Sequence, residues 1–220
     1  MLFTVFHSDE SVGDFHQRAL DGVTEPTIWL PTIPTHPTLV LGSRQNEGVL
    51  DLAACEQRNV TVVKRRSGGG AVLVSAHDLV WMDVLVTRNH PGWDDDVRRS
   101  FRWLSECLLV ALNELGVDGT AHVGSMINTQ WSDLICFAGL GPGEITVDGR
   151  KLVGISQRRT RNVARFQVAI LRAWDPDAMF ALFDLDDATR ERGVAAIADA
   201  GCVIDAPPAA VIDAVTRALG

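Results

Sequence analysis

A run of basic residues that leads into three glycines is the part of this chain best suited to bind an anion. It consists of Lys64, Arg65, Arg66, Ser67, Gly68, Gly69 and Gly70. Glycine has no side chain, so a ligand can lie directly on the backbone and meet free N–H groups. The apolar runs at residues 60–63 and 71–74 predict a strand on each side, joined by a tight glycine turn. A glycine-rich hairpin with solvated basic residues is the simpler interpretation of the same pattern.

A second segment places a lysine where it could act on a carbonyl or phosphate group. Asp148 and Gly149 separate two alternating runs, which predicts a β-hairpin with a two-residue turn. Lys151 begins the second strand and alternates with Val153 and Ile155, so we expect it to share their face of the sheet. If that face is the core side, Lys151 is a partly buried cation that needs a partner or a ligand. On the solvent side it would be an edge lysine that discourages aggregation.

Together these segments resemble the biotin/lipoate protein ligase family. Its lipoate ligases carry a Gly-x-x-Gln-Asn stretch, an Arg-Arg-x-Ser-Gly-Gly-Gly-Ala-Val motif, an Asn-Asp pair and a Gly-x-Lys-x-x-Gly-Ser-Ala motif. The corresponding segments here are residues 42–46, residues 64–72 with Lys64 for the first arginine, Ser132-Asp133, and residues 149–156. The four matches follow the family's order and span about residues 40 to 160.

For a ligase, the resemblance implies ATP-dependent activation of lipoate or octanoate to an acyl-adenylate, which a lysine of a lipoyl domain then attacks. Lys151 is implied as the catalytic residue beside the phosphate and carbonyl oxygens. Asp133 is implied to orient this lysine or to bind magnesium. The residues implied to bind the substrate or the adenylate are Arg65, Ser67, Gly68, Gly69, Gly70, Ala71, Asp133, Gly154 and Ser156.

Cys136 supports a different mechanism within the same superfamily. Residues 136–144 resemble the Cys-Phe-x-x-Pro-Ser-x-Tyr-Glu stretch of the Gram-positive-type octanoyltransferases, whose cysteine takes the acyl group as a thioester. That mechanism needs no ATP, and an ammonium near the cysteine would favour its nucleophilic thiolate. Cys136 could equally be a small buried hydrophobe. Gly70 stands where those transferases carry arginine, so the sequence favours the ligase and keeps the Cys136 transferase as the alternative.

Two departures from the family pattern open a third interpretation, a catalytically silent binding protein of the same fold. Val74 replaces the family's histidine after the glycines, and a His-Asp pair follows three residues late at 77–78. Residues 166–169 stand where the family has His-His-Gly-Thr. Retention of Lys151 and Asp133 argues against a silent protein.

The composition fits a compact enzyme. The 220 residues, with 46% hydrophobic content, suffice for one domain with a sizeable core. The net charge of −8 argues against nucleic-acid binding, and no apolar stretch approaches a membrane span of about 20 residues. Four cysteines without metal-type spacing, and no recognisable signal peptide, predict reduced thiols and a cytoplasmic location.

The partners implied by the resemblance are lipoyl-domain acceptors, namely 2-oxoacid dehydrogenase E2 subunits and the glycine cleavage H protein. Acyl carrier protein is a further candidate partner. Positive charge in this acidic chain is local, and such clusters suit a phosphate-bearing small molecule or an acidic partner protein. The second cluster consists of Arg150, Lys151, Arg158, Arg159, Arg161 and Arg165.

The elements that must position these residues form an α+β pattern. Besides the two strands beside the glycines and the lysine hairpin, strands are predicted at residues 2–7, 27–30, 38–41, 79–86 and 166–171. Helices are predicted at 9–22, 51–57, 94–116, 178–182, 188–198 and 209–219. We expect a mixed or antiparallel sheet with helices packed on it, similar to the biotin/lipoate protein ligase catalytic domain. Residues 1–220 would form a single lipoate ligase-like catalytic domain, with an α/β core at 1–174 and a helical C-terminal extension at 175–220.

Overall fold

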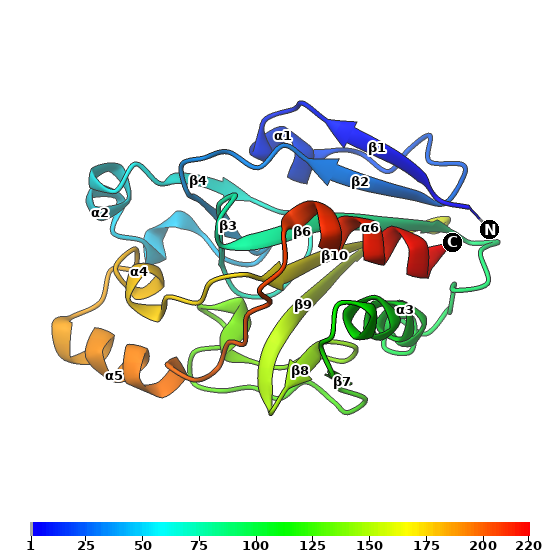
Figure 1. Ribbon diagram of the computed structural model, residues 1–220. Helices are drawn as coiled ribbons and strands as arrows, with labels where there is room; N and C mark the ends of the chain where they lie inside the picture. The colour runs from blue at the N-terminus through cyan, green and yellow to red at the C-terminus, as the bar shows by residue number, and fades with distance from the viewer. Residues whose placement is uncertain (1) are drawn as a thin grey trace.

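The computed structural model describes residues 2–220 and contains a seven-stranded and a three-stranded sheet (Figure 1). The larger sheet has the order β1 (Thr4–Ser8), β2 (Thr27–Pro31), β6 (Leu79–Thr87), β10 (Val163–Leu171), β9 (Arg150–Arg159), β8 (Ile145–Val147) and β7 (Thr120–Ala121). Strands β1 and β2 are parallel, and the other neighbours are antiparallel. The predicted mixed sheet is therefore confirmed.

The smaller sheet corrects the predicted glycine hairpin. Its order is β4 (Thr61–Lys64), β3 (Thr38–Leu41) and β5 (Val72–Val74), so β3 lies between the two strands that flank the glycines. The glycine segment therefore crosses the end of β3 instead of closing a hairpin. The crossing is close: the N–H of Ser43 donates to the carbonyl of Ser67 at 2.8 Å. A Cβ on Gly42 would collide with the carbonyl oxygen of Gly69, so only glycine fits there.

Side chains cap the starts of four α-helices. The helices are α1 (Val12–Gln17), α2 (Leu52–Gln57), α3 (Phe101–Glu114), α4 (Pro176–Phe180), α5 (Asp187–Ile197) and α6 (Pro208–Leu219), with 3-10 turns η1 (Glu47–Val49) and η2 (Cys136–Ala138). Side-chain oxygens of Ser11, Asp51, Asp175 and Asp186 accept N–H groups at four helix starts. The predicted bounds of α2, α4, α5 and α6 agree with the structure to within about two residues.

Two helices differ from the prediction. Helix α1 is only six residues long, because the backbone leaves the helical region at Arg18. Helix α3 begins at Phe101 rather than at Asp94. The aspartates before it close a separate turn instead, in which Asp96 accepts the N–H of Arg98 at 2.8 Å. Side-chain acceptors satisfy such turns as readily as helix starts, so the acidic run alone did not locate the helix.

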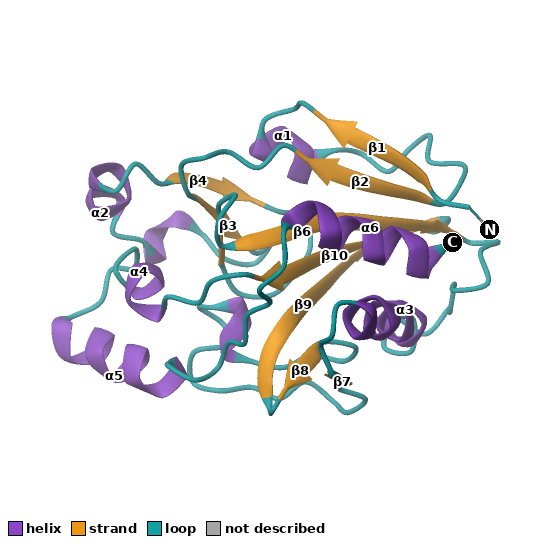
Figure 2. Ribbon diagram, viewed as in Figure 1, coloured by secondary structure: helices purple, strands orange, loops and turns teal. Residues whose placement is uncertain are grey.

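The two faces of the larger sheet carry different layers. Helices α3 and α6 lie together on one face, where Leu104, Leu108, Val211 and Val215 pack against the sheet (Figure 1). The other face carries a second apolar cluster around Trp81. Helices α4 and α5 lie beside the smaller sheet at one end of the molecule, as Figure 2 shows. Residues 175–220 therefore supply apolar side chains to two of the cores.

Candidate active site

Lys151 is a buried cation with three oxygen partners. Its side chain is 4% exposed, and Nζ lies 2.7 Å from Oε2 of Glu144. The ammonium also donates to the carbonyl oxygens of Cys136, at 3.0 Å, and of Gly139, at 3.2 Å. Glu144 is fixed in turn, because Oε1 accepts the N–H of Ile155 at 3.0 Å. Of the two placements left open by the sequence, the structure has the buried one, and the partner is Glu144.

A register shift in the lysine hairpin lies next to this pair. Asp148 and Gly149 form the predicted turn, with φ of 50° and 77°. Beyond it, Ile145 pairs with Val153 but Thr146 pairs with Lys151, which leaves one extra residue in β9. Such a bulge re-aims the neighbouring side chains.

The bulge places the side chain of Lys151 on the opposite face of the sheet from Val153 and Ile155. Val153 and Ile155 lie in the core beneath α3 and α6. The Lys151 ammonium instead lies 4.9 Å from the centre of the Phe137 ring, which belongs to the cluster on the other face. The expectation that these three residues share one face is therefore wrong, because strict alternation does not survive the extra residue.

Arg65 organises the glycine turn from inside. Its side chain is 1% exposed. The guanidinium donates to Oγ of Ser67 at 3.1 Å and to the carbonyls of Val40, Gly68 and Gly70 at 3.1, 2.7 and 2.8 Å. We expected Arg65 to contact a phosphate. Its N–H groups are directed at the protein's own oxygens and hold the turn, and the phosphate contact stays a prediction.

Cys136 lies where the glycine turn meets η2. Its N–H donates to the carbonyl of Ala71 at 3.0 Å. Its Sγ lies 3.8 Å from the position that a Cβ on Gly69 would take. A Cβ on Gly70 would lie 2.6 Å from the backbone of Ile135 and 2.7 Å from that of Cys136, so the two segments touch only because Gly70 has no side chain. The glycine turn, the thiol and Lys151 thus form one site.

The electrostatics of this site couple a cation to the thiol. Burial lowers the pKa of Arg65, whereas interaction with Cys136 and with Glu144 raises it. Cys136 therefore lies within electrostatic reach of the Arg65 guanidinium, and its backbone carbonyl contacts the Lys151 ammonium.

The glycine turn also offers hydrogen-bond donors. Across residues 2–220, the backbone N–H groups of Gly68, Gly69 and Gly70 have no acceptor. Gly69 is exposed and adopts φ of 97°, a conformation that favours glycine. Such N–H groups can stabilise negative charge on an oxygen that develops beside Cys136.

A chain of polar side chains runs from the glycine turn across the larger sheet. Ser67 Oγ donates to Oε1 of Gln167 at 2.6 Å and lies 2.9 Å from Oγ of Ser156. Gln167 Nε2 lies 3.1 Å from Nδ1 of His16. Burial first, and two nearby guanidinium groups second, lower the pKa of His16 to about 3. His16 is therefore neutral near pH 7, and its Nδ1 can accept from Gln167.

Of the remaining predicted site residues, Gly154 is buried next to Lys151 and Asp133 is exposed. A Cβ on Gly154 would lie 3.3 Å from Cε of Lys151, so this glycine borders the lysine as expected. Asp133 is exposed, and its carbonyl accepts from Gln45 Nε2 at 3.0 Å. The carboxylate that contacts Lys151 is Glu144 and not Asp133.

The predicted magnesium site at Asp133 is not part of a larger cluster of metal-ligating side chains in the described chain. Residues 2–220 contain no group of three or more His, Cys, Asp or Glu side chains placed to hold a metal ion. Magnesium commonly takes one or two carboxylates together with substrate phosphates and water. Asp133 alone would thus have to share the ion with a bound nucleotide.

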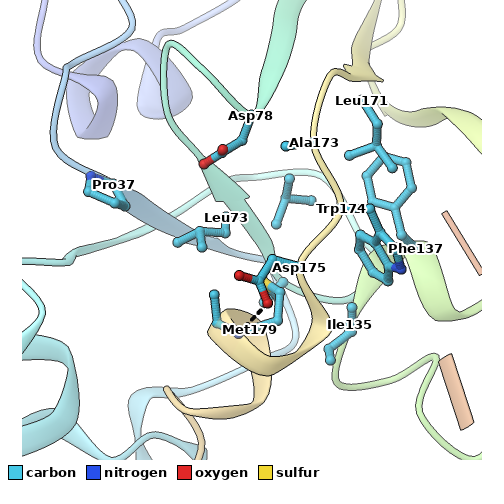
Figure 3. A pocket seen from close by; sticks show the side chains of 13 residues that line it. Pro37, Leu73, Asp78, Ile135, Phe137, Leu171, Ala173, Trp174, Asp175 and Met179 are labelled. Carbon is cyan, nitrogen blue, oxygen red and sulfur yellow. Dashed lines mark hydrogen bonds between the residues drawn. The ribbon is translucent and has the colours of Figure 1, made fainter. Parts of the chain in front are cut away.

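An apolar pocket lies directly behind η2 (Figure 3). Its cavity volume is about 180 Å³. Phe137 and Trp174 form one side of it, with ring centres 5.9 Å apart, and Met179 of α4 and Leu73 lie on other sides. Two residues that flank Cys136, Ile135 and Phe137, line this pocket.

Sequence reasoning missed two residues that build the site. Glu144 closes the stretch that resembles the transferases, but its pairing with Lys151 depends on the fold around η2. His16 lies in a short helix, 151 residues away from Gln167 in the chain. Only the fold brings it to the network, and no local pattern indicates its role.

The sequence profile of the lipoyl protein ligase A/B catalytic domain matches residues 12–206. The chain belongs to this family. The match runs across the expected boundary at 174/175, so helices α4 and α5 lie within the matched region.

Curated relatives in this family include octanoyltransferases. The chain is 36% identical over 197 residues to octanoyltransferase LipM of Kyrpidia tusciae, covering 84% of this chain and 67% of that one. It is 31% identical over 192 residues to LipM of Moorella thermoacetica, covering 84% and 68%. The chain therefore spans about two thirds of the length of these relatives.

Solved structures of family members share the fold. A structure from the lipoylation system of Thermoplasma acidophilum, a bipartite lipoate protein ligase with its E2 lipoyl domain, matches with a TM-score of 0.76 at 17% identity. That match covers 100% of this chain and 82% of the other. Lipoate-protein ligase A bound with ATP matches with a TM-score of 0.66 at 18% identity, covering 100% and 86%. These likenesses confirm the predicted α+β fold. Among the described residues, no helix is both long and apolar enough to span a membrane.

Proposed function

We propose that this chain is an acyltransferase that moves an octanoyl or lipoyl group from a thioester donor to a lysine of a lipoyl domain, through a thioester on Cys136. The observation that carries the proposal is the position of Cys136 between the glycine turn and the Lys151–Glu144 pair. The octanoyltransferase names of the relatives support the same choice. This is the alternative of the sequence analysis, and it replaces the ATP-dependent ligase as the leading hypothesis.

In the first half-reaction, the Cys136 thiolate attacks the carbonyl carbon of the donor thioester. A carbon–sulfur bond to Cys136 forms and the bond to the donor sulfur breaks, so the donor leaves as a thiol after taking one proton. The carbonyl oxygen carries negative charge between these events. The N–H groups of Gly69 and Gly70, which have no acceptor within residues 2–220, would stabilise it.

In the second half-reaction, the amine of the acceptor lysine attacks the acyl group on Cys136. An amide bond forms, the bond to sulfur breaks, and the proton lost by the amine restores the thiol. Lys151 acts in both steps as a fixed positive charge beside the reacting carbonyl. Its three oxygen partners also hold η2, so it positions the nucleophile as well.

The pocket behind η2 supports an apolar acyl substrate. Most of its lining is apolar, as in sites that bind apolar ligands. Because Ile135 and Phe137 line it on either side of the nucleophile, an acyl chain in the pocket would have its carbonyl end near Cys136. Medium-length acyl chains, such as octanoyl, fit this arrangement better than acetyl groups, which would leave the pocket empty.

An ATP-dependent ligase is the second candidate. It is favoured by Gly70, which matches the ligase motif, and by the free N–H groups of the turn, which could equally contact an adenylate phosphate. In that case ATP, magnesium and Asp133 would act together. The inward orientation of Arg65 argues against it, because this guanidinium would have to leave four acceptors to reach a phosphate.

One assay separates the two candidates. The protein is incubated with a lipoyl domain and either an octanoyl thioester or octanoate, each with and without ATP and magnesium. The acceptor's intact mass is then measured. We expect one octanoyl group on the acceptor from the thioester alone. Transfer only from free octanoate with ATP would replace the proposal by the ligase, and transfer in neither case would indicate a silent binding protein.

A further inference from the structure

Two arginines near the site have positive charge that the protein does not neutralise. Arg158 is half-buried on β9, and its Nε is shielded from solvent without a hydrogen-bond partner. Arg66, next to Arg65 at the start of the glycine segment, is exposed and donates only to the carbonyl of Gln17, at 3.4 Å. Within residues 2–220, neither Arg66 nor Arg158 forms an ion pair with a carboxylate.

The two arginines lie on either side of Arg165. Arg158 is the cross-strand partner of Arg165, and both Arg165 and Arg66 donate to backbone carbonyls at the end of α1. Burial lowers the pKa of Arg158, and the charges of Arg66 and Arg165 lower it further. Arg165 is committed to Asp83, with which it forms a buried ion pair. Arg66 and Arg158 are therefore a pair of cations whose mutual repulsion a bound anion would relieve.

Arg158 is the outermost of three β9 residues that form a strip leading away from the active site. Gly154, Ser156 and Arg158 alternate along β9 and share one face. Gly154 borders Lys151, and Ser156 contacts Ser67. The four steps along the strand from Gly154 to Arg158 span about 13 Å at a rise of about 3.3 Å per residue. Exposure increases outward, from buried Gly154 to half-buried Ser156 and Arg158.

The distance of about 13 Å between Gly154, beside Lys151, and Arg158 indicates which class of phosphate-bearing ligand would fit. In an acyl-adenylate, the phosphate is bonded directly to the acyl group, so its charge would lie beside Lys151 and the glycine turn. A phosphate about 13 Å away requires a long neutral arm between the charge and the reacting sulfur. The phosphopantetheine arm has this chemistry: a thioester sulfur at one end, amide groups along its length and a phosphate at the other end.

We propose that Arg66 and Arg158 bind the phosphate of a phosphopantetheine thioester donor while its acyl group lies beside Cys136. The proposal rests on the proposed function, since it assumes that a thioester is the acyl donor. Carrier-protein donors and coenzyme A donors share this arm, so the site would recognise the phosphate common to both. The arm would lie along the strip, where the Ser156 hydroxyl is within reach of its amides.

A binding measurement tests this site without requiring acyl transfer. Calorimetry compares 4′-phosphopantetheine with pantetheine, which lacks only the phosphate, on the wild type and on the Arg66→Gln and Arg158→Gln variants. We expect each variant to weaken binding of 4′-phosphopantetheine at least about tenfold, the loss of one charge-assisted contact, and to leave pantetheine binding unchanged. Arg98→Gln is the matched control, because Arg98 is an exposed arginine of the turn before α3, and the substitution makes the same change in net charge.

Equal affinity of the wild type for the two ligands, or variants that behave like the Arg98 control, would overturn the proposal. Acylation of Cys136 by phosphate-free S-octanoyl-pantetheine is measured separately. If that acylation fails while phosphate-dependent binding is present and lost in the variants, the proposed function fails and the anion site stands. If acylation succeeds but the phosphate makes no difference to binding, only the anion site is refuted.

Discussion

The Lys151 ammonium donates to the backbone carbonyl of Cys136 across 3.0 Å. The lysine therefore holds the segment that carries the thiol. Its pairing with Glu144 compensates its charge in a buried position, and this arrangement links the two residues on which ligase and transferase mechanisms depend. Loss of the lysine should affect the fold of η2 together with catalysis, so the two effects have to be separated experimentally.

The Lys151–Glu144 pair gives the first prediction. Lys151→Met alone leaves a buried carboxylate without its partner, which typically costs about 3–5 kcal/mol of stability. Lys151→Met combined with Glu144→Gln removes both charges, so we expect the double variant to recover most of the free energy of unfolding while transfer stays absent. Urea denaturation and the transfer assay are run on the same samples. Normal transfer by the stable double variant would exclude a catalytic role for Lys151.

The close approach of the glycine turn to η2 gives the second prediction. Gly70→Ala places a Cβ 2.6–2.8 Å from the backbone of Ile135 and Cys136, so the two segments must separate. We expect a loss of about 1–3 kcal/mol in stability and a fall in transfer rate of about 10², because the thiol is displaced. Gly68→Ala is the matched control for the melting temperature, since its Cβ would meet no atom within 4 Å. Equal melting temperatures for the two variants would contradict the packing described.

His16 gives a prediction about pH. Its pKa is 6.5 unperturbed and about 3 in the folded protein, so the unfolded chain binds the proton more readily between these values. Stability from this residue is therefore fully present above about pH 6.5 and is lost as the pH falls toward about 3, by on the order of 4 kcal/mol. His16→Asn should show a shallower loss of stability with acid in urea titrations. The exposed His77→Asn is the control, and an unchanged slope in His16→Asn would contradict the prediction.

The pocket behind η2 gives a prediction about chain length. Ala178 of α4 lines it, and a phenylalanine there would fill part of the space. Ala178→Phe should raise KM for octanoyl thioesters about tenfold and change KM for butyryl thioesters much less, because the shorter chain leaves room. Ala181→Phe serves as the control, since Ala181 ends the same helix and does not line the pocket. A uniform effect on both chain lengths would place the acyl group elsewhere.

The sequence predicted most of this fold because its signals are local. The Asp148-Gly149 turn requires positive φ at both residues, and the caps of α2, α4 and α5 require only residues within three positions. The order of the smaller sheet was not predictable in this way. Whether β3 inserts between β4 and β5 depends on contacts between distant segments, such as Gly42 with Gly69.

The site also combines features set by local sequence with features set by contacts between distant segments. Motif residues around Ser67, Lys151 and Cys136 were identified because their types and spacing are unusual. Their roles were assigned less well, since a role depends on direction. Arg65 points inward to four protein oxygens instead of toward a ligand. The acidic partner of Lys151 is Glu144 instead of Asp133, because η2 and the bulge in β9 bring that carboxylate to the ammonium.

The central claim is that Cys136 carries the acyl group, and an intact-mass measurement tests it most directly. Wild-type protein is incubated with an octanoyl thioester donor in the absence of ATP and of any acceptor. We expect one octanoyl mass that hydroxylamine removes, present in the Cys202→Ser control and absent in Cys136→Ala. No mass gain on the wild type without ATP, or acceptor modification by Cys136→Ala at the wild-type rate, would contradict the account.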